Sequence, residues 1–230
     1  MIDDHENLWL SNGYIYELNT GNMYQNTIAG EPMLNAPLMD RQGNFWFNHH
    51  DRYVKYDRKN KRSVSVEAPV SSGFDKSEHY VWGISADRQL YRMSIGEGDI
   101  AVLKYDLAQW QIDEISVIRA VSDETILIGS KTSGLWQYDV RTQTAHQIFF
   151  ENYVRDILCY SSSVCWIATE NGIYLYDINS HKVEHWRKDP HDVFAIQDHA
   201  IYSFYKDREG GVWCGSYFRG LSYVPNSQCK

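Results

Sequence analysis

The sequence predicts an all-β fold, a β-propeller of about six four-stranded blade repeats. The first observation is an antiparallel meander in residues 200–224, where three apolar runs are separated by an Asp-Arg-Glu-Gly-Gly turn and a short Tyr-Phe-Arg-Gly loop. The second is the return of this pattern at intervals of roughly 40 residues, a spacing typical of propeller blades. The third is that no stretch has a sustained helical period. The large central residues of the six repeats are Trp9, Trp46, Trp82, Leu127, Trp166 and Trp213.

Inner and outer strands are expected between these central strands. In chain order they are predicted at 23–28, 33–39, 62–67, 71–76, 100–105, 115–121, 145–150, 154–160, 182–186 and 200–205. Pro37 disfavours a regular strand at 33–39, and 71–76 has a poor strand pattern. Asp57, Asp106, Asp139 and Asp177 each follow a tyrosine at a strand end, where a turn-capping role is favoured over calcium binding.

The strand pattern leaves the first repeat without an inner strand and the last without an outer one. Residues 1–230 therefore form a single domain that we expect to be a truncated propeller, cut from a seven-bladed one with a blade's worth of sequence before Met1. An unclosed ring would expose apolar blade faces, so we expect the chain either to associate or to shut into a smaller ring.

Packing explains most of the aromatic residues. A blade is covered on both faces by its neighbours, so its central strands need large side chains pointing both ways. Gly129, Ala168 and Gly215 fit places where backbones crowd together near the axis.

Composition excludes several functions. The formal net charge is −8 and no block of Lys or Arg is present, which argues against nucleic-acid or anionic-membrane partners. No apolar run is long enough to span a bilayer, and the acidic N-terminus does not resemble a secretory signal. Cys159 and Cys165 flank a short connection and could bridge, although two small buried thiols are the favoured interpretation.

The phrase from Asp207 to Leu221 closely resembles the repeat of the two-component regulator propeller family, in which an aspartate, a glycine, an apolar-Trp-Ile-Gly-Thr strand and a Gly-Leu strand follow one another. Leu127 departs from the repeat by replacing the tryptophan, and Asn48 by replacing the glycine. The resemblance implies an extracytoplasmic, periplasmic sensor region of a hybrid histidine kinase. Membrane attachment, the kinase histidine and the receiver aspartate would then lie outside this chain.

The search for chemistry finds no catalytic residue, metal site or cofactor motif. His49-His50-Asp51 is interpreted as an exposed polar loop rather than a metal or catalytic group. His181 and His185 are interpreted as outer-strand surface.

Loop residues at equivalent blade positions remain as candidates for a ligand-binding face. Aromatic and arginine side chains there could stack on and hydrogen-bond a small polar ligand such as an oligosaccharide. The candidate ligand-binding residues are His49, Arg52, Arg88, Tyr217, Phe218 and Arg219, with Asp87, Lys131 and Glu170 nearby in the pattern.

These observations favour a non-catalytic, carbohydrate-sensing module that self-associates in the full receptor. The alternatives are a free-standing propeller enzyme, of the lyase or glycan-cleaving type, and a protein-interaction platform.

Overall fold

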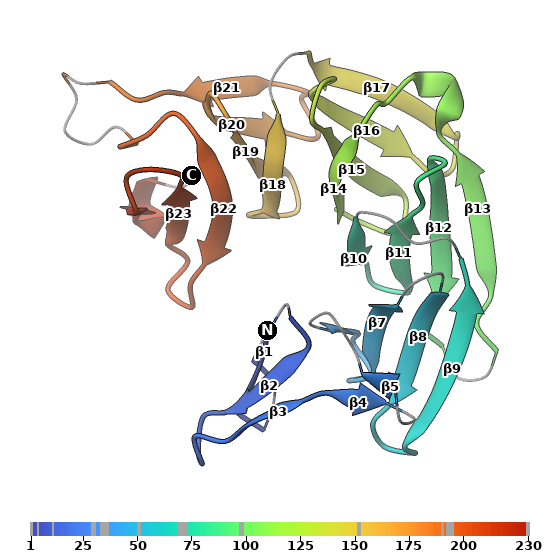
Figure 1. Cartoon of the computed structure of the whole chain (residues 1–230). Coiled ribbons are helices and arrows are strands. Elements are labelled where there is room, and N and C mark those ends of the chain that lie inside the picture. The colour runs from blue at the N-terminus through green and yellow to red at the C-terminus, as the bar shows by residue number, and fades with distance from the viewer. Residues whose placement is uncertain are drawn as a thin grey trace. The chain divides into compact units, whose positions relative to one another are not determined.

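The computed structural model describes residues 2–3, 5–10, 12–28, 31–32, 37–49, 52–68, 73–96, 99–150, 153–189, 191 and 196–228. Within them the regular structure is β-strand, apart from two single turns of 3-10 helix at Ala108–Trp110 and Asn226–Gln228 (Figure 1). The chain forms two compact units, unit 1 at Met1–Asp106 and unit 2 at Leu107–Lys230.

Unit 1 contains three blade sheets in which consecutive strands pair antiparallel. The first is β1 (Asn7–Trp9), β2 (Tyr14–Glu17) and β3 (Met23–Gln25); the second is β6 (Leu38–Met39), β7 (Phe45–His49), β8 (Arg52–Asp57) and β9 (Arg62–Glu67); the third is β10 (Phe74–Lys76), β11 (Tyr80–Ile84), β12 (Gln89–Ser94) and β13 (Val102–Asp106). A two-stranded hairpin, β4 (Thr27–Ile28) with β5 (Glu31–Pro32), lies between the first two sheets in the chain.

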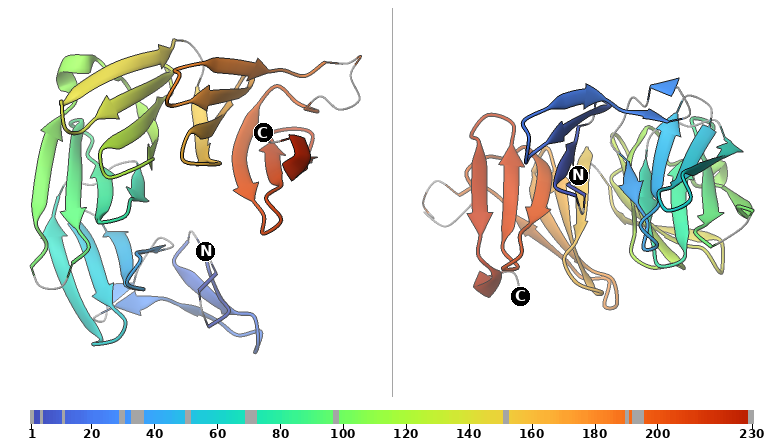
Figure 2. Two further views of the ribbon diagram at one scale, coloured as in Figure 1. Left: turned by 180° about the vertical axis from the view of Figure 1, so that it is seen from behind. Right: turned by 90° about the horizontal axis from the view of Figure 1, so that it is seen from below.

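Unit 2 contains the other three blade sheets, whose separate ribbons can be followed in Figure 2. They are β14 (Ile115–Ala120), β15 (Thr125–Ser130), β16 (Leu135–Asp139) and β17 (Thr144–Phe149); β18 (Val154–Cys159), β19 (Val164–Thr169), β20 (Gly172–Asp177) and β21 (Val183–Trp186); and β22 (Ile201–Lys206), β23 (Val212–Ser216) and β24 (Leu221–Val224).

The core of each unit lies between consecutive sheets, because alternate residues of a strand point to opposite faces. In unit 2, Leu127 and Ile167 belong to a cluster between the β14–β17 and β18–β21 sheets. Trp166 belongs to the next cluster with Val212 and Cys214 of the last sheet. Neighbouring residues of one strand, Trp166 and Ile167, thus fill two different interfaces, as the sequence pattern predicts.

The predicted all-β fold with six propeller blade repeats is confirmed, including the three-stranded first and last sheets. The outer strand expected at 23–28 was wrong in detail, because it is divided at Asn26: β3 pairs with β2 in the first blade sheet, whereas β4 pairs with β5 in a separate hairpin. The inner strand expected at 33–39 is described only as β6, and 33–36 lie outside the described residues. Derivation from a seven-bladed ring stays a prediction.

Aspartates organise the inner hairpins of three blades. Asp40 Oδ1 accepts the backbone N–H groups of Gln42 and Asn44, and its Oδ2 accepts the indole N–H of Trp46 at 2.8 Å. Asp3 with Trp9 and Asp207 with Trp213 repeat the same indole contact at 2.9 and 3.2 Å. One side chain therefore closes the turn and anchors the central tryptophan of the blade.

Candidate functional site

Each inner strand of unit 2 begins with a β-bulge at the same position. The pairing with the next strand shifts between Ile115 and Val117, between Val154 and Asp156, and between Ile201 and Ser203. The extra residues are Ser116, Arg155 and Tyr202. A bulge turns the extra side chain out of the ladder's alternation, and bulges are common next to functional sites for that reason.

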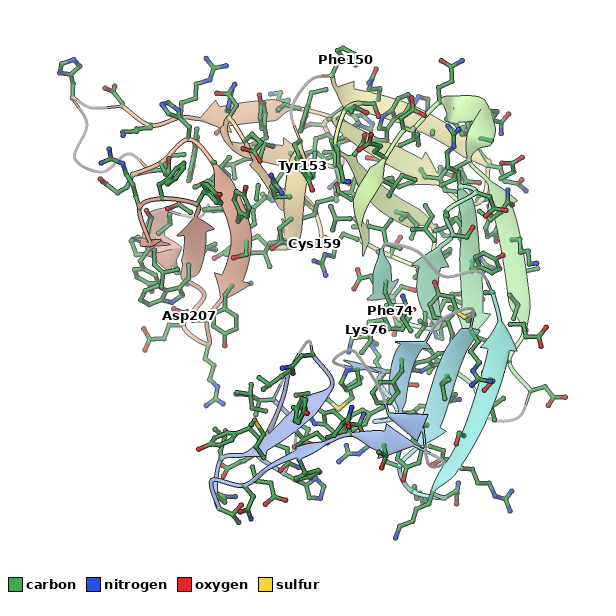
Figure 3. The ribbon with its side chains drawn as sticks, viewed as in Figure 1. Phe74, Lys76, Phe150, Tyr153, Cys159 and Asp207 are labelled. Carbon is green, nitrogen blue, oxygen red and sulfur yellow. The ribbon has the colours of Figure 1, made fainter. Side chains whose placement is uncertain are left out.

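Two of these bulge residues meet in an aromatic and arginine cluster. The Arg155 guanidinium lies 3.6 Å from the ring centre of Tyr153 and 4.2 Å from that of Tyr202. Tyr202 stacks on Tyr217 with ring centres 5.1 Å apart, and Tyr217 meets Phe218 edge to face at 4.3 Å. We call Tyr153, Arg155, Tyr202, Tyr217 and Phe218 the aromatic cluster. Tyr153, labelled in Figure 3, lies directly before β18.

The aromatic cluster is fixed by two carboxylates. Arg155 Nε donates to Glu170 Oε1 at 2.7 Å, and the Nη2 atom makes an ion pair with the same oxygen. Asp198 accepts the backbone N–H of Phe218 at 3.0 Å and that of His199 at 2.8 Å. Burial disfavours the charged form of Asp198 and so tends to raise its pKa. The hydrogen bonds from these N–H groups have the larger effect, and the pKa of Asp198 is lowered. The loop that carries Tyr217 and Phe218 is therefore held by a charged acceptor at neutral pH.

The aromatic cluster offers aromatic faces and a planar cation rather than acid and base groups. Tyr217 is 59% exposed and Phe218 82% exposed, so their faces are open to a ligand. Such surfaces bind flat or ring-shaped polar molecules by stacking and by hydrogen bonds from guanidinium and phenol groups. Among the described residues, no group of three or more His, Cys, Asp or Glu side chains is arranged to hold a metal ion.

The six candidate ligand-binding residues predicted from the sequence are divided between the two units. Tyr217, Phe218 and Arg219 form the turn between β23 and β24, where Arg219 N bonds to Ser216 Oγ. His49 and Arg52 are paired residues at the ends of β7 and β8, and Arg88 occupies a left-handed position, φ 64°, in the turn before β12. Ligand binding by any of the six stays a prediction.

Sequence reasoning missed Tyr153, Arg155 and Tyr202. Tyr153 directly precedes the inner strand predicted at 154–160, whereas Arg155 and Tyr202 lie within the first residues of the strands predicted at 154–160 and 200–205, where strict alternation assigns side chains to blade interfaces. The bulges break that alternation. The one signal in the sequence that could have pointed to these residues is that they recur at the same place, the start of an inner strand.

The remaining polar motifs are structural where they are described. Asp57, Asp139 and Asp177 accept backbone N–H groups two or three residues ahead, which confirms the turn interpretation for these three, and those N–H donors lower their pKa values. His185 stacks on Tyr174 at 3.8 Å and bonds to Asn171 O. His181 Nδ1 contacts the Tyr176 hydroxyl at 2.8 Å. His50 and Asp51 lie outside the described residues.

Unit 1 has an open groove of about 810 Å³ that is lined by residues of its first two sheets. It is lined by Trp9, Phe45 and Tyr56 together with the polar groups of turns 40–44 and 57–62. Arg58 contacts His5 there at 3.0 Å and covers the Phe45 ring at 4.6 Å. Arg52 and Arg88 are not among the described residues that line this groove.

No family model and no curated protein matches the sequence. Among solved structures, the chain is similar to the extracellular domain of a hybrid two component system, BT3049, from B. thetaiotaomicron, with a TM-score of 0.67 and 16% identity over 95% of this chain and 31% of that one. It is also similar to the extracellular domain of a one component system, BT4673, from the same organism, with a TM-score of 0.59 and 17% identity over 95% and 31%. U3-55K matches with a TM-score of 0.66 and 12% identity over 93% and 71%.

The chain spans about a third of the length of the two bacterial structures. At these identities the similarity establishes the propeller fold. No helix among the described residues has the length and apolarity needed to cross a bilayer.

Proposed function

We propose that this chain is a non-catalytic, ligand-sensing propeller module of an extracytoplasmic two-component receptor. The observation that carries the proposal is the aromatic cluster, which presents open ring faces and a positioned guanidinium from two neighbouring blades. Sensing requires that the ligand bind the two states of a receptor with different affinity. A site built from two blades can meet this requirement, because its contacts with the ligand change when the two blades shift relative to each other. The full-length protein would be a histidine kinase.

Two further observations support this assignment. The similar bacterial structures are extracellular domains of signalling systems. The repeat from Asp207 to Leu221 also resembles that of sensor propellers. The module would accordingly act on the periplasmic side of a membrane and self-associate in its receptor.

We propose a small polar ligand, and an oligosaccharide as the class to test first. Sugar rings present flat apolar faces edged by hydroxyl groups, which suits Tyr202, Tyr217 and Phe218 beside Arg155. No cofactor is needed for such binding. The alternative propeller enzyme would need a pair of acid and base groups next to the ligand. The two carboxylates described at the aromatic cluster are both engaged in holding it, Glu170 by Arg155 and Asp198 by backbone N–H groups.

The test is titration calorimetry with xylohexaose and a chondroitin sulfate tetrasaccharide as neutral and acidic probes. Tyr217→Ala with Arg219→Ala is expected to weaken binding of the preferred probe at least about tenfold, because an exposed aromatic anchor is lost. The melting temperature should hardly change, since Tyr217 is exposed.

The matched control is Leu103→Ala with Arg141→Ala. Leu103, on the outer strand β13, and Arg141, in the turn after β16, are both exposed and belong to neither of the two sheets that form the aromatic cluster, so probe affinity should be retained. Equal affinity of the two double variants would reject the site. Chain cleavage of a probe by the wild-type protein would reject the non-catalytic assignment in favour of the enzyme.

A further inference from the structure

The hairpin formed by β18 and β19 brings two thiols together at its closed end. Cys159 and Cys165 are directly opposed in the ladder, and their Sγ atoms are 3.1 Å apart. Both side chains belong to or border the cluster between the β14–β17 and β18–β21 sheets. Cys159 is labelled in Figure 3 at the other end of β18 from Tyr153.

The ladder places this pair where a cross-strand disulfide fits. Tyr160 N donates to Val164 O at 2.9 Å, which makes this pair the hydrogen-bonded one that closes the hairpin. Because hydrogen-bonded and non-bonded pairs alternate in antiparallel ladders, Cys159 and Cys165 form a non-bonded pair, with Cα atoms about 4.5 Å apart. That separation lies within the range that disulfides span without backbone movement, roughly 4.4–6.8 Å.

We propose that Cys159 and Cys165 form a reversible disulfide that acts as a redox clasp on the fifth blade. The proposal is independent of the ligand-sensing function, since it rests on the hairpin alone. Small side-chain rotations suffice to shorten the thiol contact to a bond of about 2.05 Å. A small-molecule disulfide such as oxidised glutathione is the oxidant.

The exchange proceeds in two balanced steps. The Cys159 thiolate, on the partly exposed side of the pair, attacks one sulfur of oxidised glutathione and releases one glutathione thiolate, leaving a mixed disulfide on Cys159. Cys165 then attacks Cys159 Sγ, and the second glutathione leaves as a thiol that carries the proton lost by Cys165. Two protein thiols are oxidised and one glutathione disulfide is reduced to two thiols.

The order of attack follows from the surroundings of the two thiols. Cys165 is wholly buried, whereas Cys159 is partly exposed. The hydrogen bond to Cys159 and burial raise the pKa of the Cys165 thiol. Cys165 is therefore a poor first nucleophile and serves to resolve the mixed disulfide.

The clasp adjoins the contact between the fifth and sixth blades. The hydroxyl of Tyr160, next to Cys159, shares its one proton between Gly210 O at 3.0 Å and Asn226 Oδ1 at 2.8 Å. Lys206 donates to Tyr160 O at 2.9 Å and lies 4.1 Å from the Tyr160 ring centre. Fixing the hairpin beside Tyr160 is expected to steady the last sheet as well as its own.

The test equilibrates the intact chain with oxidised or reduced glutathione, blocks thiols with iodoacetamide and analyses peptides by mass spectrometry. The tryptic peptide 156–182 should lose two hydrogens and escape alkylation only in the oxidised sample. Closing this short loop is expected to raise the melting temperature by roughly 5 °C. Amide exchange should slow in 156–169 and in 201–226.

Variants separate the clasp from other thiol effects. Cys159→Ser should abolish the glutathione-dependent shift in melting temperature, while Cys214→Ala, which changes a buried thiol of another cluster, should retain it. Full alkylation of both cysteines after oxidation would overturn the proposal. So would a persistent mixed disulfide on Cys159, or a bridge from either residue to Cys214 or Cys229.

Discussion

The aspartate that begins the inner hairpin of a blade combines two structural roles. In the first blade, Asp3 Oδ1 accepts backbone N–H groups of His5 and Asn7, and Oδ2 accepts the Trp9 indole N–H at 2.9 Å. In the fifth blade, Tyr160 occupies the corresponding position, and Trp166 Nε1 has no hydrogen-bond partner among the described residues. Trp166 is nevertheless wholly buried. Packing thus suffices to place the tryptophan, and the aspartate adds polar stabilisation.

The contribution of the Asp3 carboxylate to the free energy of unfolding should depend on pH, and Asp3→Asn removes that contribution. Burial disfavours the Asp3 carboxylate, but hydrogen bonds from Trp9, Asn7 and His5 prevail and lower its pKa below the ordinary 3.8. Its stabilisation is therefore complete above that ordinary value and disappears as the pH falls through the lowered one. We expect Asp3→Asn to lower the free energy of unfolding by about 1–2 kcal/mol at pH 7.

Urea denaturation at pH 7 and at pH 2.5 checks this expectation. The wild type and Asp3→Asn should differ at the higher pH, and the difference should become smaller at the lower one as the Asp3 carboxylate begins to protonate. Glu67→Gln removes an exposed carboxylate from the outer strand β9 and should change neither value. A constant difference at both pH values would contradict a role for the Asp3 charge.

At this scale the sequence could predict most of the structure but not the site. The Asp-to-Trp spacing is local, so the hairpins and central strands follow from residues six positions apart. Arg155 and Tyr202 meet only because strands 47 positions apart along the chain are packed together. Local patterns carry no information on such contacts.

The inner strands show how neighbouring sheets of unit 2 are held together. Arg119 of β14 donates through Nε to Ile157 O of β18 at 2.7 Å, and Asp156 of β18 accepts the Phe204 N–H of β22 at 2.8 Å. A Cβ atom on Gly129 would approach Val154 Cγ1 to 2.5 Å and Val117 Cγ1 to 2.7 Å. The crowding expected near Gly129 is present, although the close neighbours are side chains rather than backbone.

Gly129→Ala is therefore expected to be destabilising by about 1–3 kcal/mol, because the added methyl overlaps two β-branched side chains that have few alternative rotamers. Thermal unfolding followed by circular dichroism measures this loss. Gly96→Ala is the control, because nothing lies within 4 Å of the added atom. Equal melting temperatures for the two variants would show that the inner strands move apart freely.

The positions of the strands could be predicted from the sequence, but the bulges within them could not. Strand positions follow from apolar runs and turn residues, so β9 and the three strands of the last sheet agree closely with the sequence pattern. A bulge inserts one residue without changing composition, and the sequence pattern cannot show which partner residue it faces. The sequence therefore predicts regular strands at Arg155 and Tyr202, although their bulged positions create the aromatic cluster.

At the scale of the molecule, the last sheet leaves an apolar face open. Tyr205, Trp213 and Tyr223 form one row across β22, β23 and β24, with the Trp213 and Tyr223 ring centres 4.7 Å apart. Trp213 is 40% exposed, whereas its counterpart Trp166 is wholly buried beneath the last sheet. Leu221, on the same face as Tyr223, is also exposed. A blade face of this composition is normally covered by another sheet.

We expect the open face of the last sheet to drive self-association of the chain. Light scattering after size-exclusion chromatography should show a molar mass that rises with protein concentration. Tyr205→Ser with Leu221→Ser should shift the protein toward the monomer at nearly constant melting temperature, because both side chains are mostly exposed. The control, Val64→Ser with Leu103→Ser, changes exposed apolar residues on the outer strands β9 and β13 and should leave association intact. A monomer at every concentration would instead favour closure of the chain into a smaller ring, since only an intramolecular cover could then shield Trp213 from water.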